Sequence, residues 1–502
     1  MPDKQETELD ILIRARYPLI YLVSWEERRV ESMLASLAAR RGKRLYFWTV
    51  TEGMAEANAS PDSSTRDPRA ALDFVLKSDQ QAIFVLKDFH SFMQDAGVIR
   101  RLRDAAQLLK PSRKSLILLS PLLTLPVELE KDVTVVDYDL PGQEELRSLL
   151  REAVAASQGG KKYPIELKPG EEDRLVQAAL GMTLSEAENA FAKSIVRNDR
   201  LGIEALDVIL DEIKQVVRKS RQLEYYEADS DFGQIGGLEF LKDWLQRRGR
   251  AFGEEARRFG LPQPKGLLLL GVQGCGKSLT CKAIAGLWKV PLLRLDMGSI
   301  FGGIVGQSEE NMRRAIKTAE SVAPCVLWLD EIEKGLSGTR SSDFSDAGTT
   351  ARVFSSFLTW LQEKKRPVFV AATANNIQML PPELLRKGRL DEIFFVDLPA
   401  QAERREIFAI HVKGKGRDPG GFDLEALARQ AQGFSGAEIE QAVVSALYEA
   451  FYQGRDLSQP DLDAAVKSLI PLSRTMREEI DALRAWASTR ARPASLGAAE
   501  MG

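Results

Sequence analysis

One stretch constrains the architecture most: Gly271-Val272-Gln273-Gly274-Cys275-Gly276-Lys277-Ser278, which follows an apolar run at Leu267–Leu270. It fits the phosphate-loop pattern G-x-x-x-x-G-K-[ST], and the strand-like run before it is the context that this pattern requires. Glycines let backbone N–H groups turn inward around a β-phosphate, and the helix that begins there adds the positive end of its dipole. We expect Lys277 to bind the β- and γ-phosphates and Ser278 to coordinate magnesium.

A second signal lies about fifty residues downstream, where the apolar run Val326–Leu329 ends in Asp330 and Glu331. We expect Asp330 to lie beside the magnesium held by Ser278, and Glu331 to face the attacking water. A carboxylate within hydrogen-bond reach of water can orient it and accept its proton. Because strands commonly end in polar turns, this pair alone would indicate little. Combined with the upstream loop, it favours hydrolysis of a nucleotide, with ATP and Mg²⁺ as the ligands.

Apolar runs and amphipathic patterns alternate along two parts of the chain, which predicts two layered α/β domains. In the first part, the strand-like runs are Leu19–Val23, Ala82–Leu86, Ser115–Leu119 and Val133–Val136. In the second part, five runs predict a parallel sheet: Leu267–Leu270, Leu292–Leu295, Val326–Leu329, Val368–Ala371 and Ile393–Val396.

Helical patterns follow each of these parts. The first covers Glu171–Arg218, where Thr183 to Glu186 resembles a capping box, and the second covers Ala402–Leu469. We assign no fold to the Ala-, Ser-, Arg- and Gly-rich end after about Arg490. The expected domains are an N-terminal domain at 1–218, a linker at 219–231, a large α/β domain at 232–401, a helical domain at 402–475, and a C-terminal helix with a disordered tail at 476–502.

The composition excludes several classes of protein. A formal net charge of -3 over 502 residues gives no basic field for nucleic acid, so a nucleic-acid partner is not expected. No apolar run approaches the roughly 20 residues that span a bilayer, so we expect no membrane partner and a cytoplasmic location. Three cysteines and two histidines supply neither a disulfide framework nor a histidine-based metal site.

Several linked motifs resemble those of the AAA ATPases, and their order and spacing match over about Asp231 to Leu469. Besides the two motifs above, they are Asp231–Leu238, Ala371–Asn375, Pro382–Arg389 and Gly433–Ile439. The whole chain also resembles an uncharacterised AAA family of cyanobacteria, plastids and other bacteria, known as hypothetical chloroplast reading frame forty-six. The stretches Arg14–Trp25 and Gly181–Phe191 prompt that narrower match. The fold implied is a P-loop AAA ATPase module, a parallel sheet with flanking helices and a helical lid.

The resemblance also implies roles for single residues. Ile235 and Gly236 become neighbours of adenine, and the nucleotide contacts extend from Gly271–Ser278 to Leu279 and Ala437. Asn375 becomes the sensor that helps to position the water, although a strand-end amide that caps a turn is the alternative. Arg389 becomes an arginine finger that reaches a neighbouring subunit's nucleotide, although it could be a surface ion-pair partner. A homo-hexameric ring is implied.

The chain departs from the family pattern at three places. Ile304-Val305-Gly306 stands where many members place an aromatic residue in the central pore, Glu392 replaces a second arginine, and Glu333 stands where an aspartate is common. An aromatic side chain would grip a peptide better than Ile304, so threading of a protein through the pore is less secure.

The first half resembles an imperfect copy of the second. Asp139–Gln143 echoes Asp397–Gln401, and Gly181–Phe191 echoes Gly433–Val443. In place of a phosphate loop it has Ser24-Trp25-Glu26-Glu27-Arg28, which lacks glycines and lysine and would repel phosphate. We therefore expect a degenerate AAA-like module with its own helical segment. The alternative is an unrelated α/β domain with coincidental similarity.

Two functions fit this reading. The first is an oligomeric, ATP-driven remodeller of an unknown protein client. The alternative is an assembly or regulatory scaffold that ATP orders into a ring and slow hydrolysis resets. A nucleic-acid motor ranks third because of the charge balance.

Overall fold

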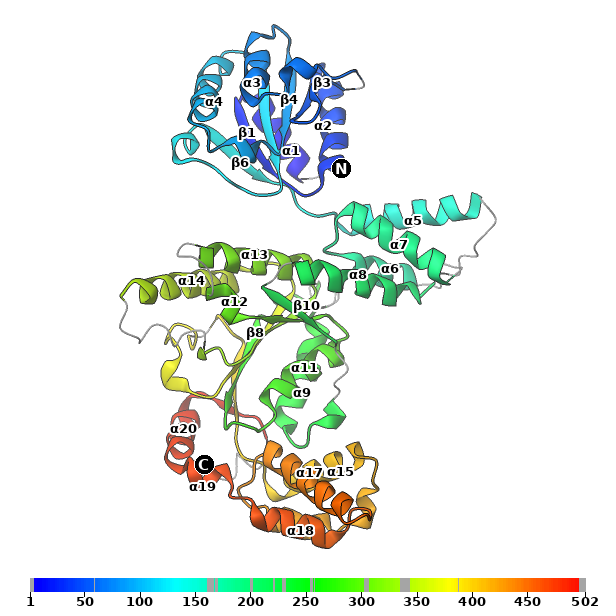
Figure 1. The fold of residues 1–502 in the computed structure, drawn as a ribbon, viewed down its shortest axis with the longest axis vertical. Coiled ribbons are helices and arrows are strands. Elements are labelled where there is room, and N and C mark those ends of the chain that lie inside the picture. The colour runs from blue at the N-terminus through cyan, green and yellow to red at the C-terminus, as the bar shows by residue number, and fades with distance from the viewer. Residues whose placement is uncertain are drawn as a thin grey trace. The chain divides into compact units, whose positions relative to one another are not determined.

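The chain forms two compact units, residues 1–209 and 210–502, in the computed structural model (Figure 1). The structure describes residues 4–57, 59–159, 167, 170–198, 202–219, 222–227, 232–252, 256, 258–301, 307–334, 344–386 and 388–495. Ile304 and Lys387 lie outside these ranges, and so does Asp231. Among the helices in these ranges, none is long and apolar enough to cross a membrane.

The first unit is built on a six-stranded sheet with the order β3-β2-β4-β5-β1-β6. The four predicted strands are confirmed as β1 (Leu19–Val23), β4 (Ala82–Lys87), β5 (Ser115–Ser120) and β6 (Val133–Asp137). Two strands were not predicted, β2 (Arg44–Thr49) and β3 (Gly53–Glu56). All pairings are parallel except that of β2 with β3. Gly, Ala and Glu, which are depleted in strands, make up most of β3, so its sequence carries little strand signal.

Helices cover both faces of this sheet (Figure 1). Alternate residues of β1 enter different cores: Leu19 and Tyr21 pack with α3 (Pro68–Lys77) and α4 (Ala96–Leu109), whereas Ile20 and Leu22 pack with α1 (Lys4–Arg14) and α2 (Glu27–Arg41). Because both faces of β1 are buried, its sequence is a continuous apolar run.

A helical segment follows β6, with α5 (Gln143–Gly159), α6 (Glu171–Ala179), α7 (Leu184–Asn198) and α8 (Ala205–Lys219). The predicted capping box is confirmed. The Glu186 carboxylate accepts the Thr183 N–H at 3.0 Å, and Thr183 Oγ1 accepts the Glu186 N–H at 3.2 Å.

The second unit has a seven-stranded sheet with the order β13-β12-β8-β11-β10-β9-β7. Its five central strands confirm the predicted parallel sheet: β8 (Gly266–Gly271), β9 (Leu292–Leu295), β10 (Cys325–Leu329), β11 (Val368–Ala374) and β12 (Glu392–Val396).

Both edge strands correct the sequence analysis. The segment expected to be a linker contains β7 (Leu223–Tyr226), which pairs antiparallel with β9. Leu223 is buried and Tyr226 packs edge-on against Trp328, and these contacts hold β7 in the sheet. The tail after Arg490 was expected to have no fold, yet Arg492–Pro493 forms β13 beside β12. Charged and proline-containing residues suit an edge strand, so composition alone misled here. Residues 496–502, the rest of the expected disordered tail, lie outside the described residues.

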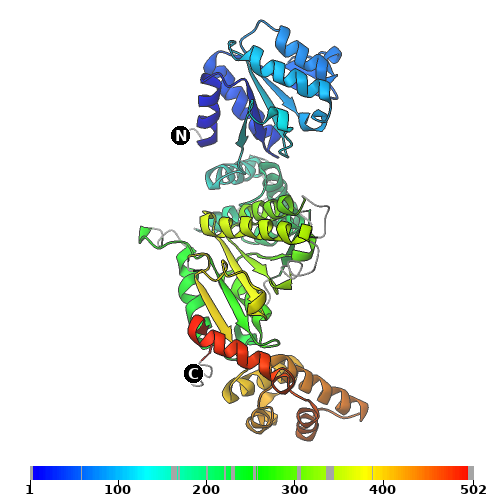
Figure 2. The ribbon, with the colours of Figure 1, turned by 90° about the vertical axis from the view of Figure 1, so that its left-hand side faces the viewer.

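Helices also flank the second sheet. Figure 1 shows α9 (Glu239–Gly249) and α11 (Lys277–Trp288) on one face and α13 (Gln307–Ser321) and α14 (Phe344–Glu363) on the other. The predicted helical lid is present as α15 (Gln401–Gly414), α16 (Leu424–Gln430), α17 (Gly436–Tyr452) and α18 (Gln459–Ser468), which share one apolar core. In Figure 2 the lid lies at one end of this unit, next to α20 (Arg477–Arg490).

The parallel strands of the two sheets follow one order. Across the sheet, the parallel strands lie in the order β6-β1-β5-β4-β2 in the first unit and β12-β8-β11-β10-β9 in the second. If the parallel strands of each unit are numbered along the chain from one to five, both orders are 5-1-4-3-2. A non-glycine residue with positive φ follows the third strand in both, Asp88 at 51° and Glu331 at 46°. The first unit thus has the strand order expected of the predicted AAA-like α/β module.

Candidate active site

The glycine-rich loop joins β8 to the N-terminus of α11. Gly276 is the N-cap residue, with φ of 83°, and no side chain caps this end of the helix among the described residues. A Cβ at Gly271 would lie 1.9 Å from the carbonyl oxygen of Val396, so only glycine fits there. The first-turn N–H groups of α11 therefore remain available for an anion, and the helix dipole favours one.

Lys277 lies inside this loop. Its buried ammonium group donates hydrogen bonds to the carbonyl oxygens of Gly271 at 2.9 Å and Val272 at 2.7 Å. Burial lowers the pKa of Lys277, and the carboxylates of Glu333, Glu331 and Asp330 oppose that effect. The positive charge is thus held beside the loop by neutral acceptors that an anionic ligand could replace.

Two hydroxyl groups converge on Asp330. Ser278 Oγ donates to Asp330 Oδ1 at 2.8 Å, and Thr373 Oγ1 donates to the same oxygen at 2.9 Å. The guanidinium group of Arg294 lies 3.9 Å from the other oxygen, Oδ2. The structure therefore brings both predicted metal ligands, Ser278 and Asp330, into contact, and oxygen donors of this kind suit Mg²⁺.

Glu331 is held from three sides. Its N–H donates to Thr373 Oγ1 at 2.9 Å, its Oε1 accepts from Asn375 Nδ2 at 3.0 Å, and its Oε2 pairs with Lys334. The backbone N–H of Asn375 donates to Glu333 Oε1 at 2.8 Å. The side chain of Asn375 thus contacts the predicted base, while the neighbouring Asn376 caps the next turn.

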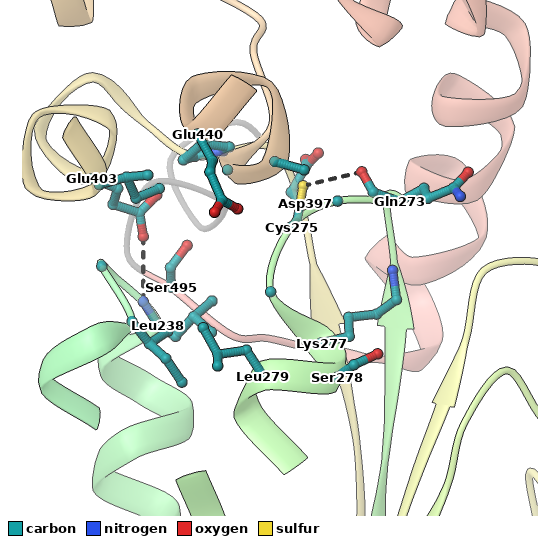
Figure 3. Close-up of a pocket in the computed structure, with 18 of the residues that line it drawn as sticks. Leu238, Gln273, Cys275, Lys277, Ser278, Leu279, Asp397, Glu403, Glu440 and Ser495 are labelled. Atoms are coloured by element: carbon teal, nitrogen blue, oxygen red, sulfur yellow. Dashed lines mark hydrogen bonds between the residues drawn. The ribbon is translucent and has the colours of Figure 1, made fainter. Parts of the chain in front are cut away.

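A cavity of about 330 Å³ opens between this loop, the chain just before α9, and the lid (Figure 3). Most of the predicted nucleotide contacts line it: Ile235, Gly236, Gln273–Leu279, Glu331, Asn375 and Ala437. Gly271 and Val272 instead accept hydrogen bonds from Lys277, and Asp330 contacts Ser278. The volume lies within the range of small-molecule sites.

Several residues that line the cavity were not predicted. They are Asp397, Glu403, Ile407, His411, Glu440 and Ser495. A Cβ at Gly236 would lie 2.8 Å from Ile407 Cγ1, which explains why the chain needs glycine where it passes the lid. Burial lowers the pKa of His411 and raises that of Glu403. No local sequence signal marked these side chains, because they come together only when the lid packs on the sheet.

Arg389 lies apart from the cavity, in the loop before β12. Its side chain is half-buried, its Nη1 has no hydrogen-bond partner and it forms no ion pair among the described residues. A single chain thus does not bring Arg389 to the nucleotide loop. That placement is compatible with a contact to a neighbouring subunit.

The corresponding place in the first unit carries opposite charges. Glu27 is the first residue of α2, as Lys277 is the first residue of α11 in the second unit. Lys87 is the last residue of β4, and its counterpart in the second unit is Asp330, which follows β10. Lys87 pairs with Glu27 at 2.7 Å and also with Glu31. The phosphates would meet Glu27, and a magnesium ion would meet Lys87, so this place repels both parts of a magnesium nucleotide.

Glu26 connects that place to the helical segment of the first unit. Its buried carboxylate accepts the N–H of Leu184, the first residue of α7, at 2.6 Å. Burial raises the pKa of Glu26, and the hydrogen bond from Leu184 opposes that effect. A protein carboxylate at the start of α2 is thus hydrogen-bonded to the start of α7.

Family profiles match along the chain. They are described as SpoVK-like AAA ATPase, N-terminal domain, at residues 5–138; SpoVK-like AAA ATPase, second domain, at 144–220; ATPase family associated with various cellular activities (AAA), at 267–398; and AAA+ lid domain, at 421–464.

Similar proteins extend over nearly the whole chain. The uncharacterized AAA domain-containing protein ycf46 of Pyropia yezoensis is 41% identical over 494 residues, 97% of this chain and 99% of that protein. Its namesake in Guillardia theta is 40% identical over 96% of this chain and 94% of that protein. A cell division cycle protein 48 homolog of Archaeoglobus fulgidus is 32% identical over 259 residues, 50% of this chain and 35% of that protein.

Proposed function

This chain belongs to the family of ycf46 AAA domain-containing proteins, as its motifs predicted, and from that premise we propose that it hydrolyses ATP with Mg²⁺ in the second unit. The observation that carries the proposal is the convergence of two hydroxyls on Asp330 and of the Asn375 amide on Glu331. Such a network fixes one carboxylate for a metal and orients its neighbour as a base.

The residues fit a magnesium nucleotide. The uncapped N-terminus of α11 and the ammonium group of Lys277 would hold the phosphates, and Ser278 with Asp330 would hold the metal. Bound magnesium would neutralise charge on the phosphoryl oxygens. Ile235 and Gly236 would contact adenine, across from Ala437 at the start of α17.

Glu331 would orient the attacking water and accept its proton. The Asn375 amide donates to one of its oxygens, which leaves the carboxylate in a fixed orientation. Thr373 fixes the Glu331 backbone at an unusual φ of 46°. These positions would be set before the nucleotide binds, which is the condition for efficient electrostatic catalysis.

Arg389 would complete the site of a neighbouring subunit. It lies away from its own cavity, and its buried Nη1 has no partner among the described residues, so its side chain would turn outward to reach the neighbour. An arginine supplied in this way contributes about 10³- to 10⁵-fold to the rate in GTPases. We therefore propose a homo-hexamer whose subunit motions remodel a protein client of unknown identity.

The scaffold alternative also has an observation in its favour. Both oxygens of Glu331 are engaged, one by Asn375 and one by Lys334. A carboxylate neutralised by a lysine is a weaker base, so hydrolysis would be slow until Lys334 moves away. ATP would then order the ring and recruit partners, and slow turnover would reset it.

Phosphate release by the purified chain tests this proposal. Wild type should release phosphate in Mg²⁺ but not in EDTA, and Lys277→Ala and Glu331→Gln should each abolish release. Release that survives Lys277→Ala would overturn the assignment. If wild type binds ATP yet turns over more slowly than Lys334→Ala, the scaffold is favoured.

Ile304→Ser tests threading separately, since a threading remodeller should lose its effect on a client while keeping phosphate release.

A further inference from the structure

The segment after α20 is built into the sheet of the second unit. Arg492 and Pro493 pair with Phe394 and Phe395 of β12. Ala494, which is fully buried, donates its N–H to the carbonyl oxygen of Phe395 at 3.0 Å and accepts the N–H of Leu241 at 3.2 Å. The segment therefore bridges β12 and α9, whose neighbours Asp397 and Leu238 line the cavity.

A second anchor lies at α20 itself. The guanidinium group of Arg484 donates to both oxygens of Asp397, at 2.8 and 2.9 Å. Asp397 follows β12 directly, its side chain is 5% exposed, and it lines the cavity near Cys275 of the phosphate loop (Figure 3). A bidentate pair of this kind fixes the geometry as well as the charge. The C-terminal helix is thus tied to the wall of the cavity before the segment enters the sheet.

Ser495 is the point where the segment reaches the cavity. It is 6% exposed and lines the cavity at the end away from Lys277 and Ser278. Figure 3 shows it beside Glu403 and Leu238, and Leu238 follows Ile235 and Gly236 closely in the chain. Burial raises the pKa of the nearby Glu403 carboxylate, and the smaller effect of Ser495 lowers it.

Glu403 in turn connects this end of the cavity to two other segments. Its Oε1 accepts the N–H of Leu238 at 3.4 Å, and its Oε2 accepts the N–H of Ala400 at 2.7 Å. A Cβ at Gly237 would lie 2.2 Å from Glu403 Oε1, so the contact is close. The chain before α9, the start of the lid and the C-terminal segment meet at this one carboxylate.

We propose that the segment Ala491–Ser495 is part of the nucleotide site, with Ser495 contacting the base end of bound ATP. This inference rests on the proposed function. The hydroxyl can donate to or accept from a ring nitrogen or a ribose hydroxyl. Because the segment completes one wall of the cavity, nucleotide binding and docking of the segment stabilise each other, and that coupling is reciprocal.

Three variants, one substituted and two shortened at the C-terminus, test this proposal. The affinity of each for a fluorescent ATP analogue is measured in Mg²⁺ and compared with that of the wild-type chain. A chain that ends at Ser495 is the control and should bind as wild type does. Ser495→Ala should weaken binding about three- to tenfold, because the variant loses one hydrogen bond to the nucleotide. A chain that ends at Arg490 should bind more than tenfold more weakly. Equal affinity of wild type and the chain ending at Arg490 would overturn the inference, whereas wild type that binds no analogue would overturn the proposed function itself.

Hydrogen exchange gives a second test that needs no truncation, in case the shortened chain does not fold. In wild type, the N–H groups of Ala494 and Leu241 should exchange at least several-fold more slowly with ATP bound, and in Lys277→Ala added ATP should have no effect. Unchanged exchange at both N–H groups in saturated wild type would contradict the coupling.

Discussion

Thr373 offers a direct test of how the two catalytic carboxylates are held. This side chain is 1% exposed, and its hydroxyl has two partners. It donates to Asp330 Oδ1 and accepts the N–H of Glu331, both at 2.9 Å. Thr373→Val keeps the shape of the side chain and removes both hydrogen bonds.

The magnitude follows from these two losses. A buried N–H left without a partner costs about 1–3 kcal/mol, and a hydrogen bond to a charged group contributes about 1.5–3 kcal/mol. We expect the free energy of unfolding of the second unit to fall by about 3 kcal/mol, which lowers its melting temperature by about 6–12 °C. Glu331 would also relax from its left-handed backbone conformation, and a displacement near 1 Å costs about 100-fold in kcat.

Calorimetry and steady-state ATP hydrolysis measure the two effects, with Thr373→Ser as the matched control. Serine retains the hydroxyl and should keep most of the stability and turnover. The reasoning is refuted if valine and serine give the same melting temperature and the same kcat. It is also refuted if valine lowers stability but leaves kcat unchanged, because Thr373 would then have no part in placing Glu331.

Three further predictions concern other parts of the chain. Calorimetric titration should find one ATP analogue bound per chain and none after Lys277→Ala, and binding that survives would place a nucleotide in the first unit. Glu26→Ala should destabilise the first unit by about 1 kcal/mol because the Leu184 N–H loses its acceptor, while Glu26→Gln costs less. Arg455 holds the pKa of Asp461 well below its usual range, so the ionised carboxylate stabilises the lid above about pH 4 and that contribution is lost as pH falls further. Between about pH 5 and pH 2, the melting temperature should therefore fall more steeply for wild type than for Asp461→Asn.

The elements with strong local signals were predictable from the sequence. The five parallel strands of the second unit are continuous apolar runs, because helices cover both faces of the sheet. The loop at Gly271–Ser278 and the pair Asp330–Glu331 are fixed by the chemistry that they serve, and the structure joins them through Ser278. The echoes between the two halves, although short, predicted a shared topology correctly.

The edge strands and the far end of the cavity were not predictable in the same way. Leu223–Tyr226 and Arg492–Pro493 have polar composition because one side of an edge strand faces solvent. Glu403 and His411 lie on different turns of α15, and Ser495 comes from the C-terminal segment, so only tertiary packing brings all three to one cavity. Arg389 remains a prediction, since its proposed target belongs to another copy of the chain.

Mixing two inactive variants tests the central claim, a shared-site ring with one working nucleotide site per chain. Lys277→Ala keeps Arg389 but cannot hold ATP, whereas Arg389→Ala holds ATP but lacks the arginine. Each alone should be inactive. In a randomly mixed ring, about one site in four would combine an intact loop with an intact neighbouring arginine, so an equimolar mixture should recover about a quarter of wild-type hydrolysis. A mixture as inactive as its components, although the two variants co-assemble, would contradict the account.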